Sequence, residues 1–309
     1  MSGEVAERSS GGPRRPAEVR AIRTADGRSL TVREGGDPNG VPVLVHNGTP
    51  ASSLLYGPHL ADAEEQGIRL FSYDRPGYAG STRRRGRAVA DCAGDVAAVC
   101  DALGVGRFCV WGISGGGPHA LATAALLPDR VAAAAALAPV APFDAEGLDF
   151  YAGMGEQNIE EFGAIFAGED VLRALLDGVR SELITSSPDQ FVAVLQTLLG
   201  PADLEVLRGA IAGYVLAAMQ DGLAEDVDGW LDDDVAFVRP WGFDLASIRV
   251  PVLHLQGEQD RFVPPGHGAW LARHIPGVES RVLPEEGHLS LLERRLPEVH
   301  AWLVARFDP

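Results

Sequence analysis

Three polar residues in separate motifs have the side chains needed for nucleophilic catalysis. Ser114 lies in the pattern G-x-S-x-G, Asp260 follows the apolar segment VPVLHLQG, and His288 follows the segment ESRVLP. A serine hydroxyl becomes a nucleophile when a histidine accepts its proton and an acid holds that histidine in the right orientation. We therefore expect Ser114, Asp260 and His288 to act as nucleophile, acid and base in acyl chemistry.

The glycines around Ser114 allow two interpretations. A dinucleotide-binding turn requires G-x-G-x-x-G and an acid about 20 residues later, at the end of the next strand. Here Ser114 replaces the middle glycine, and the next expected strand ends in the residues LAP at 137–139. The sequence therefore favours a tight strand-to-helix turn in which Gly112 and Gly116 leave room for a strained serine.

A serine nucleophile also needs two hydrogen-bond donors for the oxyanion that forms during attack. The backbone N–H of Gly115, directly after the serine, is the first candidate. The second should come from the segment HNGTPASS at 46–53, where we expect Thr49 to be the donor and Asn47 to be the alternative. A simple Asn-Gly turn is the competing interpretation of this segment.

We expect several other polar residues to have structural rather than catalytic roles. Asp144 follows the expected sixth strand and is an alternative position for the acid, but Asp260 lies in the better-matched motif. We expect His119 to make packing or polar contacts, and His267 to lie on a surface helix. The pair Asp74–Arg75 is expected to form a local ion pair.

Elements that alternate between strand and helix must position these residues. The dipeptide Asp26-Gly27 between two alternating segments predicts an antiparallel hairpin. Apolar runs predict further strands, separated by helical patterns, and this alternation is typical of a mostly parallel sheet with right-handed crossovers. The expected strands are VPVLVHNG, IRLFSYDR, FCVWGIS, RVAAAAALAP, VPVLHLQG and ESRVLP.

About a hundred residues separate two of these strands, whereas such connections usually contain 2 to 6 residues. The intervening patterns, such as EDVLRALLDGVRSELI, are amphipathic and helical. We therefore expect a helical cap at 141–240, inserted into a core formed by 18–140 and 241–309. Residues 1–17 are polar and predict a disordered tail.

The charge distribution limits the classes of ligand. All 26 basic residues are arginine, which excludes a lysine Schiff base and a GxxxxGK[ST] phosphate loop. The segment 141–240 holds 20 acidic residues and four arginines, so it repels nucleic acid and favours neutral or cationic ligands. A solvated acidic face that aids solubility is the alternative. The run RRRGR at 83–87 is expected to be a solvated loop.

The remaining composition indicates a globular protein that stays in the cytoplasm. No segment has the 18 apolar residues needed for a membrane span, and no secretory signal pattern occurs. Cys92, Cys100 and Cys109 form no closely spaced pair, so we expect free thiols and no metal site. The sequence does not indicate an oligomeric state.

The motifs VHNGTP, SYDRPGYAGS, WGISGGGPHALA, GEQDRFVP and EEGHLSLL, in this order, resemble the α/β-hydrolase superfamily over roughly residues 20–309. The resemblance implies an α/β fold with an eight-stranded, mostly parallel sheet, helices on both faces, and a cap after strand six. It also implies the Ser114, Asp260, His288 triad and no cofactor. The usual HG dipeptide is NG here, which leaves the second oxyanion donor open. Serine at 114 argues against dehalogenases and epoxide hydrolases, which carry aspartate there.

The expected function is hydrolysis of a carboxylic ester or related acyl bond in a small, moderately apolar substrate. Cleavage of a peptide bond, C–C cleavage, a lyase step or acyl transfer by the same triad, and ligand binding without catalysis are the alternatives. The small-molecule substrate is the only partner expected, with no nucleic acid and no membrane. The apolar cap side chains that form the cap core or line a pocket are Phe150, Tyr151, Met154, Phe162, Phe166, Tyr214, Met219 and Trp230.

Overall fold

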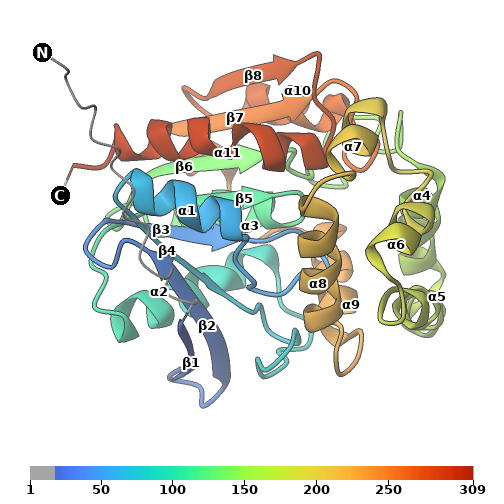
Figure 1. Cartoon of the computed structure of the whole chain (residues 1–309), viewed down its shortest axis with the longest axis horizontal. Coiled ribbons are helices and arrows are strands. Elements are labelled where there is room, and N and C mark those ends of the chain that lie inside the picture. The colour runs from blue at the N-terminus through green and yellow to red at the C-terminus, as the bar shows by residue number, and fades with distance from the viewer. Residues whose placement is uncertain (1–17, 309) are drawn as a thin grey trace, which may run out of the picture.

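A computed structural model describes residues 18–308 as an eight-stranded sheet with the strand order β1-β2-β4-β3-β5-β6-β7-β8 (Figure 1). The first two strands form the expected antiparallel hairpin, β2 also pairs antiparallel with β4, and all other neighbours are parallel. The strands are β1 (Glu18–Arg23), β2 (Ser29–Gly36), β3 (Val41–His46), β4 (Ile68–Tyr73), β5 (Phe108–Ile113), β6 (Val131–Leu137), β7 (Val252–Gly257) and β8 (Glu279–Leu283).

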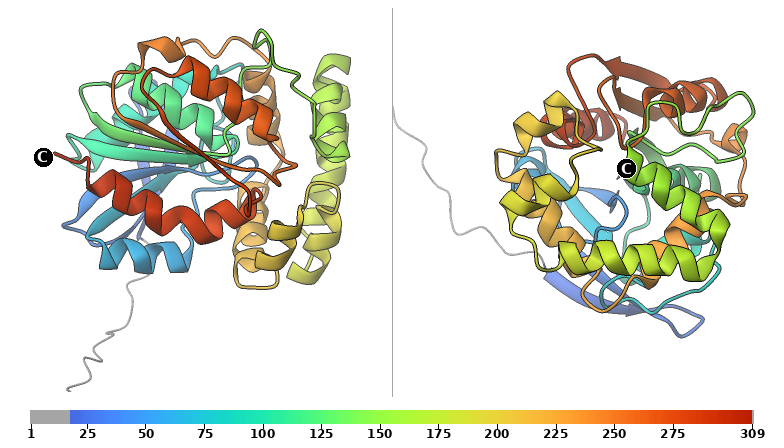
Figure 2. Two further views of the ribbon diagram at one scale, coloured as in Figure 1. Left: turned by 90° about the horizontal axis from the view of Figure 1, so that it is seen from above. Right: turned by 90° about the vertical axis from the view of Figure 1, so that its right-hand side faces the viewer.

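Helices cover both faces of the sheet (Figures 1 and 2). The strands β5 and β6 are completely buried, because side chains from both of their faces enter the two hydrophobic clusters. One cluster includes α1 (Gly57–Glu65) and α11 (Leu289–Val304), and the other includes α2 (Cys92–Ala102), α3 (Gly116–Leu126) and α10 (Pro265–His274). Two short 3₁₀ helices, η1 (Val89–Asp91) and η2 (Leu245–Ser247), complete the core.

A helical insert lies between β6 and β7, beyond the carboxyl ends of the parallel strands (Figures 1 and 2). The amphipathic pattern of its second helix is realised, because Leu172, Leu176 and Leu183 are buried on one face. The helices of the insert are α4 (Glu156–Ala167), α5 (Glu169–Leu183), α6 (Pro188–Val194), α7 (Pro201–Val206), α8 (Ile211–Gly222) and α9 (Asp228–Phe237).

The basic segment 83–87 is a loop with Arg85 exposed, as expected, but Arg83 and Arg87 join the core to the insert, so the expectation of solvated side chains was wrong for these two residues. Arg83 lies 2.6 Å from Asp228 and 2.8 Å from Asp232, both on α9. Arg87 is buried. The acidic side chains of the insert attract these guanidinium groups. Because the paired residues lie more than 140 positions apart in the chain, no local sequence pattern indicates the contact.

The described residues agree with one further expectation from composition. Cys92, Cys100 and Cys109 are buried and unpaired, as predicted. Within 18–308, no helix has both the length and the apolar composition required to cross a membrane. The predicted disordered tail, residues 1–17, lies outside the described residues.

Candidate active site

Ser114 occupies a tight turn between β5 and α3 that only glycines can flank. Its φ angle is +56°, a left-handed conformation that a non-glycine residue adopts at an energetic cost. A Cβ atom on Gly112 would lie 2.2 Å from the carbonyl oxygen of Gly116, and a Cβ on Gly116 would lie 2.0 Å from that of His46. Glycine at these two positions therefore allows the strand, the turn and the neighbouring loop to pack together.

The loop after β3 lies against this turn. A Cβ atom on Gly48 would be 3.3 Å from Cβ of Ser114, and a Cβ on Gly115 would be 2.4 Å from Oγ1 of Thr49. Within residues 18–308, the backbone N–H groups of Thr49 and Gly115 donate to no other backbone group. The structure therefore brings the two expected oxyanion donors beside Ser114 and leaves both N–H groups available.

Asn47, the alternative donor, has a different set of contacts. Its side-chain amide donates to the carbonyl oxygens of Ser52, at 2.7 Å, and Leu54, at 3.0 Å. Its own carbonyl oxygen accepts a hydrogen bond of 2.6 Å from Arg75. These contacts make Asn47 a residue that holds the loop in shape.

His288 lies at the start of α11 and contacts the carboxylate of Asp260, with 2.7 Å between Nδ1 and Oδ2. The other oxygen of Asp260 accepts hydrogen bonds from the N–H groups of Phe262, at 2.8 Å, and Val263, at 2.9 Å. The ring of Phe262 also stacks on the imidazole, with 4.6 Å between centroids. The histidine and the acid are therefore fixed relative to one another.

Burial and charge act in opposite directions on the imidazole. Burial lowers the pKa of His288, but the charge and hydrogen bond of Asp260 and the charge of Asp203 outweigh it, so the pKa is raised above its ordinary value. The proton that Asp260 accepts lies on Nδ1, because a carboxylate can only accept. This tautomer leaves Nε2 as the basic nitrogen when the ring is neutral.

Asp203 is a site residue that the sequence analysis missed. It lies on α7 of the insert, and its carboxylate accepts hydrogen bonds from the N–H groups of His288 at 3.1 Å, Leu289 at 2.8 Å and Ser290 at 3.0 Å. These are unpaired donors at the N-terminus of α11, where a negative charge is favourable. The segment PADLEV gives no local signal of this contact, which joins residues 85 positions apart.

Ser114 opens into a cavity of about 220 Å³ between the core and the insert, together with Thr49 and Gly115. The cavity wall includes Phe262, the residue that stacks on His288. Among residues 18–308, no hydrogen bond joins Ser114 to His288, and Phe262 is the cavity residue that contacts the histidine.

The cap side chains divide between this cavity and other contacts. Of the eight apolar residues considered above, Met154, Phe162, Met219 and Trp230 line the cavity. The other four do not line it, and one of them, Phe166, is 59% exposed; these four are Phe150, Tyr151, Phe166 and Tyr214. Asp144, the alternative acid, is exposed at the surface and is separate from the cavity lining.

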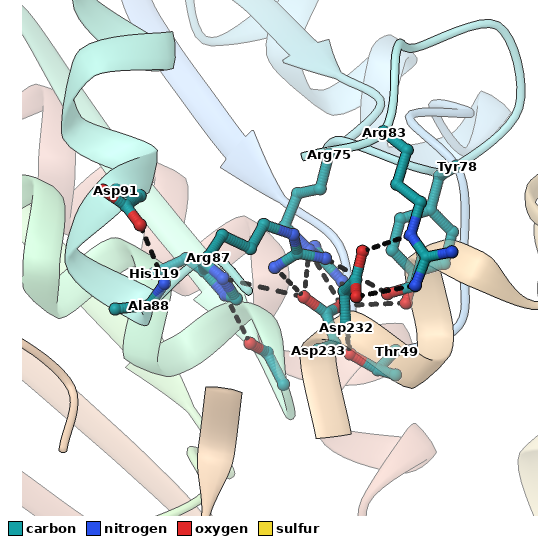
Figure 3. Close-up of polar contacts among 12 residues, drawn as sticks. Thr49, Arg75, Tyr78, Arg83, Arg87, Ala88, Asp91, His119, Asp232 and Asp233 are labelled. Atoms are coloured by element: carbon teal, nitrogen blue, oxygen red, sulfur yellow. Dashed lines mark hydrogen bonds and ion pairs between the residues drawn. The ribbon is translucent and has the colours of Figure 1, made fainter. Parts of the chain in front are cut away.

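A buried ion cluster lies beneath the Thr49 loop (Figure 3). Asp233 of α9 accepts hydrogen bonds from Arg75 and Arg87, both at 2.6 Å, from Tyr78 at 2.8 Å, and from the hydroxyl of Thr49 at 2.9 Å. Burial alone would raise the pKa of Asp233, but the charges of the two arginines hold it far below its ordinary value. The insert therefore supplies a permanent negative charge to the core.

The expected ion pair between Asp74 and Arg75 was wrong. Arg75 contacts Asp233, whereas Asp74 lies 3.2 Å from Arg33 and accepts a hydrogen bond from the N–H of Ser53. Consecutive residues at the end of a strand point to opposite sides, which separates these two side chains.

His119 connects the other oxyanion residue to the cluster. Its Nδ1 donates a hydrogen bond of 2.8 Å to the carbonyl oxygen of Gly115, and its Nε2 lies 3.8 Å from Asp233. Burial and the charge of Arg75 lower the pKa of His119 to about 3, so the ring is neutral at pH 7. The expected polar-contact role of His119 agrees with these contacts.

His267 is buried, contrary to the expectation of a surface position. Its Nδ1 accepts from the N–H of Ala141, at 3.2 Å, and its Nε2 donates to the carbonyl oxygen of Phe150, at 2.8 Å. It therefore holds together the segment that leads from β6 into the insert. The helical pattern of α10 could not show which of its faces is covered by the segment that leads from β6 into the insert.

Comparisons with known proteins agree with the architecture. Residues 41–179 match a family described as "alpha/beta hydrolase fold". The chain is 27% identical to a non-heme chloroperoxidase from Streptomyces lividans, over 79% of this chain and 83% of that protein. It is also 27% identical to a bifunctional esterase/perhydrolase from Acinetobacter calcoaceticus, over 87% of this chain and 89% of that protein.

Solved structures show the same fold over nearly the whole chain. An esterase from Rhodococcus sp. ECU1013 superposes with a TM-score of 0.67 and 22% sequence identity, covering 94% of this chain and 99% of that one. The chain therefore has the α/β-hydrolase fold.

Proposed function

We propose that the protein is a serine hydrolase that cleaves a carboxylic ester or related acyl bond. The observation that carries this proposal is the turn at Ser114, which places a serine with a φ angle of +56° at the wall of a cavity, beside two available N–H groups. A strained serine at the start of a helix is the arrangement in which a hydroxyl can attack and an oxyanion can be stabilised.

The reaction proceeds in two halves with His288 as the proton carrier. In the first half, Nε2 of His288 takes the proton of Ser114, the serine oxygen attacks the carbonyl carbon, and the N–H groups of Thr49 and Gly115 stabilise the oxyanion. The C–O bond then breaks, and the leaving alcohol takes the proton from His288. In the second half, water attacks the acyl-enzyme in the same way and releases the acid. Asp260 stabilises the imidazolium in both halves.

Cavity size and composition support a small, moderately apolar substrate. The cavity of about 220 Å³ is lined mainly by apolar side chains from the insert, including Phe162, Met219 and Trp230. Such a lining removes apolar substrate surface from water and leaves few polar groups to orient the scissile bond. Relatives named as an esterase/perhydrolase and an esterase also support ester chemistry.

Covalent labelling and burst kinetics test this proposal together. We expect a fluorophosphonate probe to label the wild-type protein and p-nitrophenyl acetate to give a burst of one nitrophenolate per active site, because an acyl-enzyme accumulates. Ser114→Ala should lose both signals. The matched control Ser247→Ala removes an exposed serine hydroxyl from η2 and should behave as the wild type.

The alternatives predict different results. If Ser114→Ala retains turnover, the reaction depends on His288 without a covalent serine intermediate, as in a lyase step. If the wild type shows neither labelling nor turnover with any ester, the proposal of a serine hydrolase is wrong.

A further inference from the structure

Two of the three carboxyl groups that line the cavity are at least partly buried and have no role in the reaction described above, and the third, Glu160, is exposed. Glu161 of α4 and Asp234 of α9 both line the cavity that contains Ser114. The indole Nε1 of Trp230 donates a hydrogen bond of 2.7 Å to Oε1 of Glu161. Asp234 is only 2% exposed, and its Oδ2 has no hydrogen-bond partner among residues 18–308. An unpaired carboxylate oxygen in an apolar cavity is costly unless a ligand or a proton satisfies it.

The two carboxyl groups share their electrostatic environment. Burial raises the pKa of Glu161 to about 7, and burial together with the charge of Glu161 raises the pKa of Asp234 well above its ordinary value. The groups are near enough to hydrogen-bond when one of them carries a proton. The raised pKa values mean that the pair favours one shared proton over two negative charges.

The neighbouring ion cluster explains why one charge is retained. Asp233 precedes Asp234 on α9 and is paired with both Arg75 and Arg87, so these three residues carry a net charge of +1. The singly charged pair formed by Glu161 and Asp234 balances this charge. The whole group is neutral with one proton in the cavity, and it stays neutral if a cation replaces that proton.

We propose that Glu161 and Asp234 form a subsite for an ammonium group of the substrate. The N–H groups of a primary ammonium would donate to Oδ2 of Asp234 and to Glu161, and the displaced proton would pass to solvent. This exchange balances charge, because one proton leaves as one cation enters. The inference concerns the same cavity as the proposed hydrolase activity and rests on it for the substrate, but not for binding of the amine.

The helix α9 relates the subsite to the reacting atoms. The ring of Phe237 approaches the turn, because a Cβ atom on Gly115 would lie 2.8 Å from its Cζ. Asp234 precedes Phe237 by three residues and lies on the same side of α9, about one helical turn or ~5 Å away along the axis. The substrate would therefore carry its amine a few bonds from the scissile carbonyl, on a compact apolar scaffold.

An equilibrium experiment tests the subsite without turnover. Isothermal titration calorimetry of Ser114→Ala would compare trans-4-(aminomethyl)cyclohexanecarboxamide with its 4-(hydroxymethyl) analogue, which has the same size and no charge. We expect the amine to bind at least tenfold more tightly at pH 7. Buffers with different ionisation enthalpies should also show proton release on binding.

Three further substitutions in the Ser114→Ala background identify the residues. Glu161→Gln and Asp234→Asn preserve shape and should each weaken amine binding at least tenfold. Glu156→Gln removes an exposed acid from the same helix and should leave the affinity unchanged. Thermal unfolding checks that each variant is folded. Equal binding of the amine and the alcohol, or unchanged affinity in both cavity variants, would overturn the proposal.

An activity comparison separates this inference from the proposed function. We expect the enzyme with Ser114 intact to hydrolyse p-nitrophenyl trans-4-(aminomethyl)cyclohexanecarboxylate with at least tenfold higher kcat/KM than the isosteric 4-ethyl ester. The preference should disappear in Asp234→Asn. Hydrolysis with a preference for the ethyl ester refutes the subsite alone, whereas amine binding without labelling or hydrolysis refutes the hydrolase alone.

Discussion

The contact between Asp203 and the start of α11 predicts how the insert affects the candidate base. In Asp203→Ala, the N–H groups of His288, Leu289 and Ser290 lose their common acceptor. Loss of an N-cap acceptor costs about 1 kcal/mol, and each further unsatisfied buried N–H costs about 1 to 3 kcal/mol. Removal of a buried charge offsets part of this, so we expect a loss of about 3 kcal/mol.

Two measurements follow from this substitution. In a chain of 309 residues, a loss of about 3 kcal/mol lowers Tm by roughly 5 °C. The charge of Asp203 contributes to the raised pKa of His288, so its removal lowers that pKa. Because the imidazole must be neutral to accept a proton, the acid limb of the kcat/KM profile for p-nitrophenyl acetate should move to lower pH.

The matched control is Asp177→Ala, which removes an exposed acid from the middle of α5 in the same insert. It should change neither Tm nor the pH profile. If Asp203→Ala keeps the wild-type Tm and the wild-type acid limb, the contact does not stabilise α11 or act on His288, and this reasoning is refuted.

Two further predictions concern the acidic residues of α9 and α4. Asp233→Ala should destabilise the protein by about 3 to 5 kcal/mol, because Arg75 and Arg87 remain buried without a counter-charge. Urea unfolding would measure this, and a loss below about 1 kcal/mol would contradict it. Since the pKa of Glu161 rises on folding to about 7, wild-type stability falls as pH rises through that value. Glu161→Gln removes this penalty, so the Tm of the variant minus the Tm of the wild type should increase between pH 5 and pH 8. If this Tm difference does not change with pH, the pKa of Glu161 is not raised on folding.

Local sequence patterns predicted the sheet and the turn at Ser114. The elbow depends on residues within a few positions of one another, so Gly112 and Gly116 are recognisable without tertiary information. The strand RVAAAAALAP was a weaker prediction, because alanine favours helices and only packing on both faces makes it a strand here. The loop containing Thr49 and Asn47 is distant in the sequence, and it could be placed beside the serine because each follows a strand of the expected parallel sheet.

Contacts between the insert and the core could not be predicted. Asp203 and Asp233 look like ordinary solvated acids in their own helices, and their partners lie 85 and 158 residues away in the chain. Arg83 and Arg87 were expected to be solvated for the same reason, since both pair with acids of α9. Net charge alone showed an acidic insert, but not which acids are neutralised by the core.

The buried position of Asp233 restricts how substrate can enter. A rigid outward swing of the complete insert would pull α9 from the core and leave Arg75 and Arg87 without their carboxylate, which is a large energetic barrier. The helices α4 to α6 have no comparable buried anchor among the described ion pairs, and Arg85 meets Glu169 at an exposed position. Substrate would therefore enter the cavity when these outer helices are displaced, while α9 stays in place against the core.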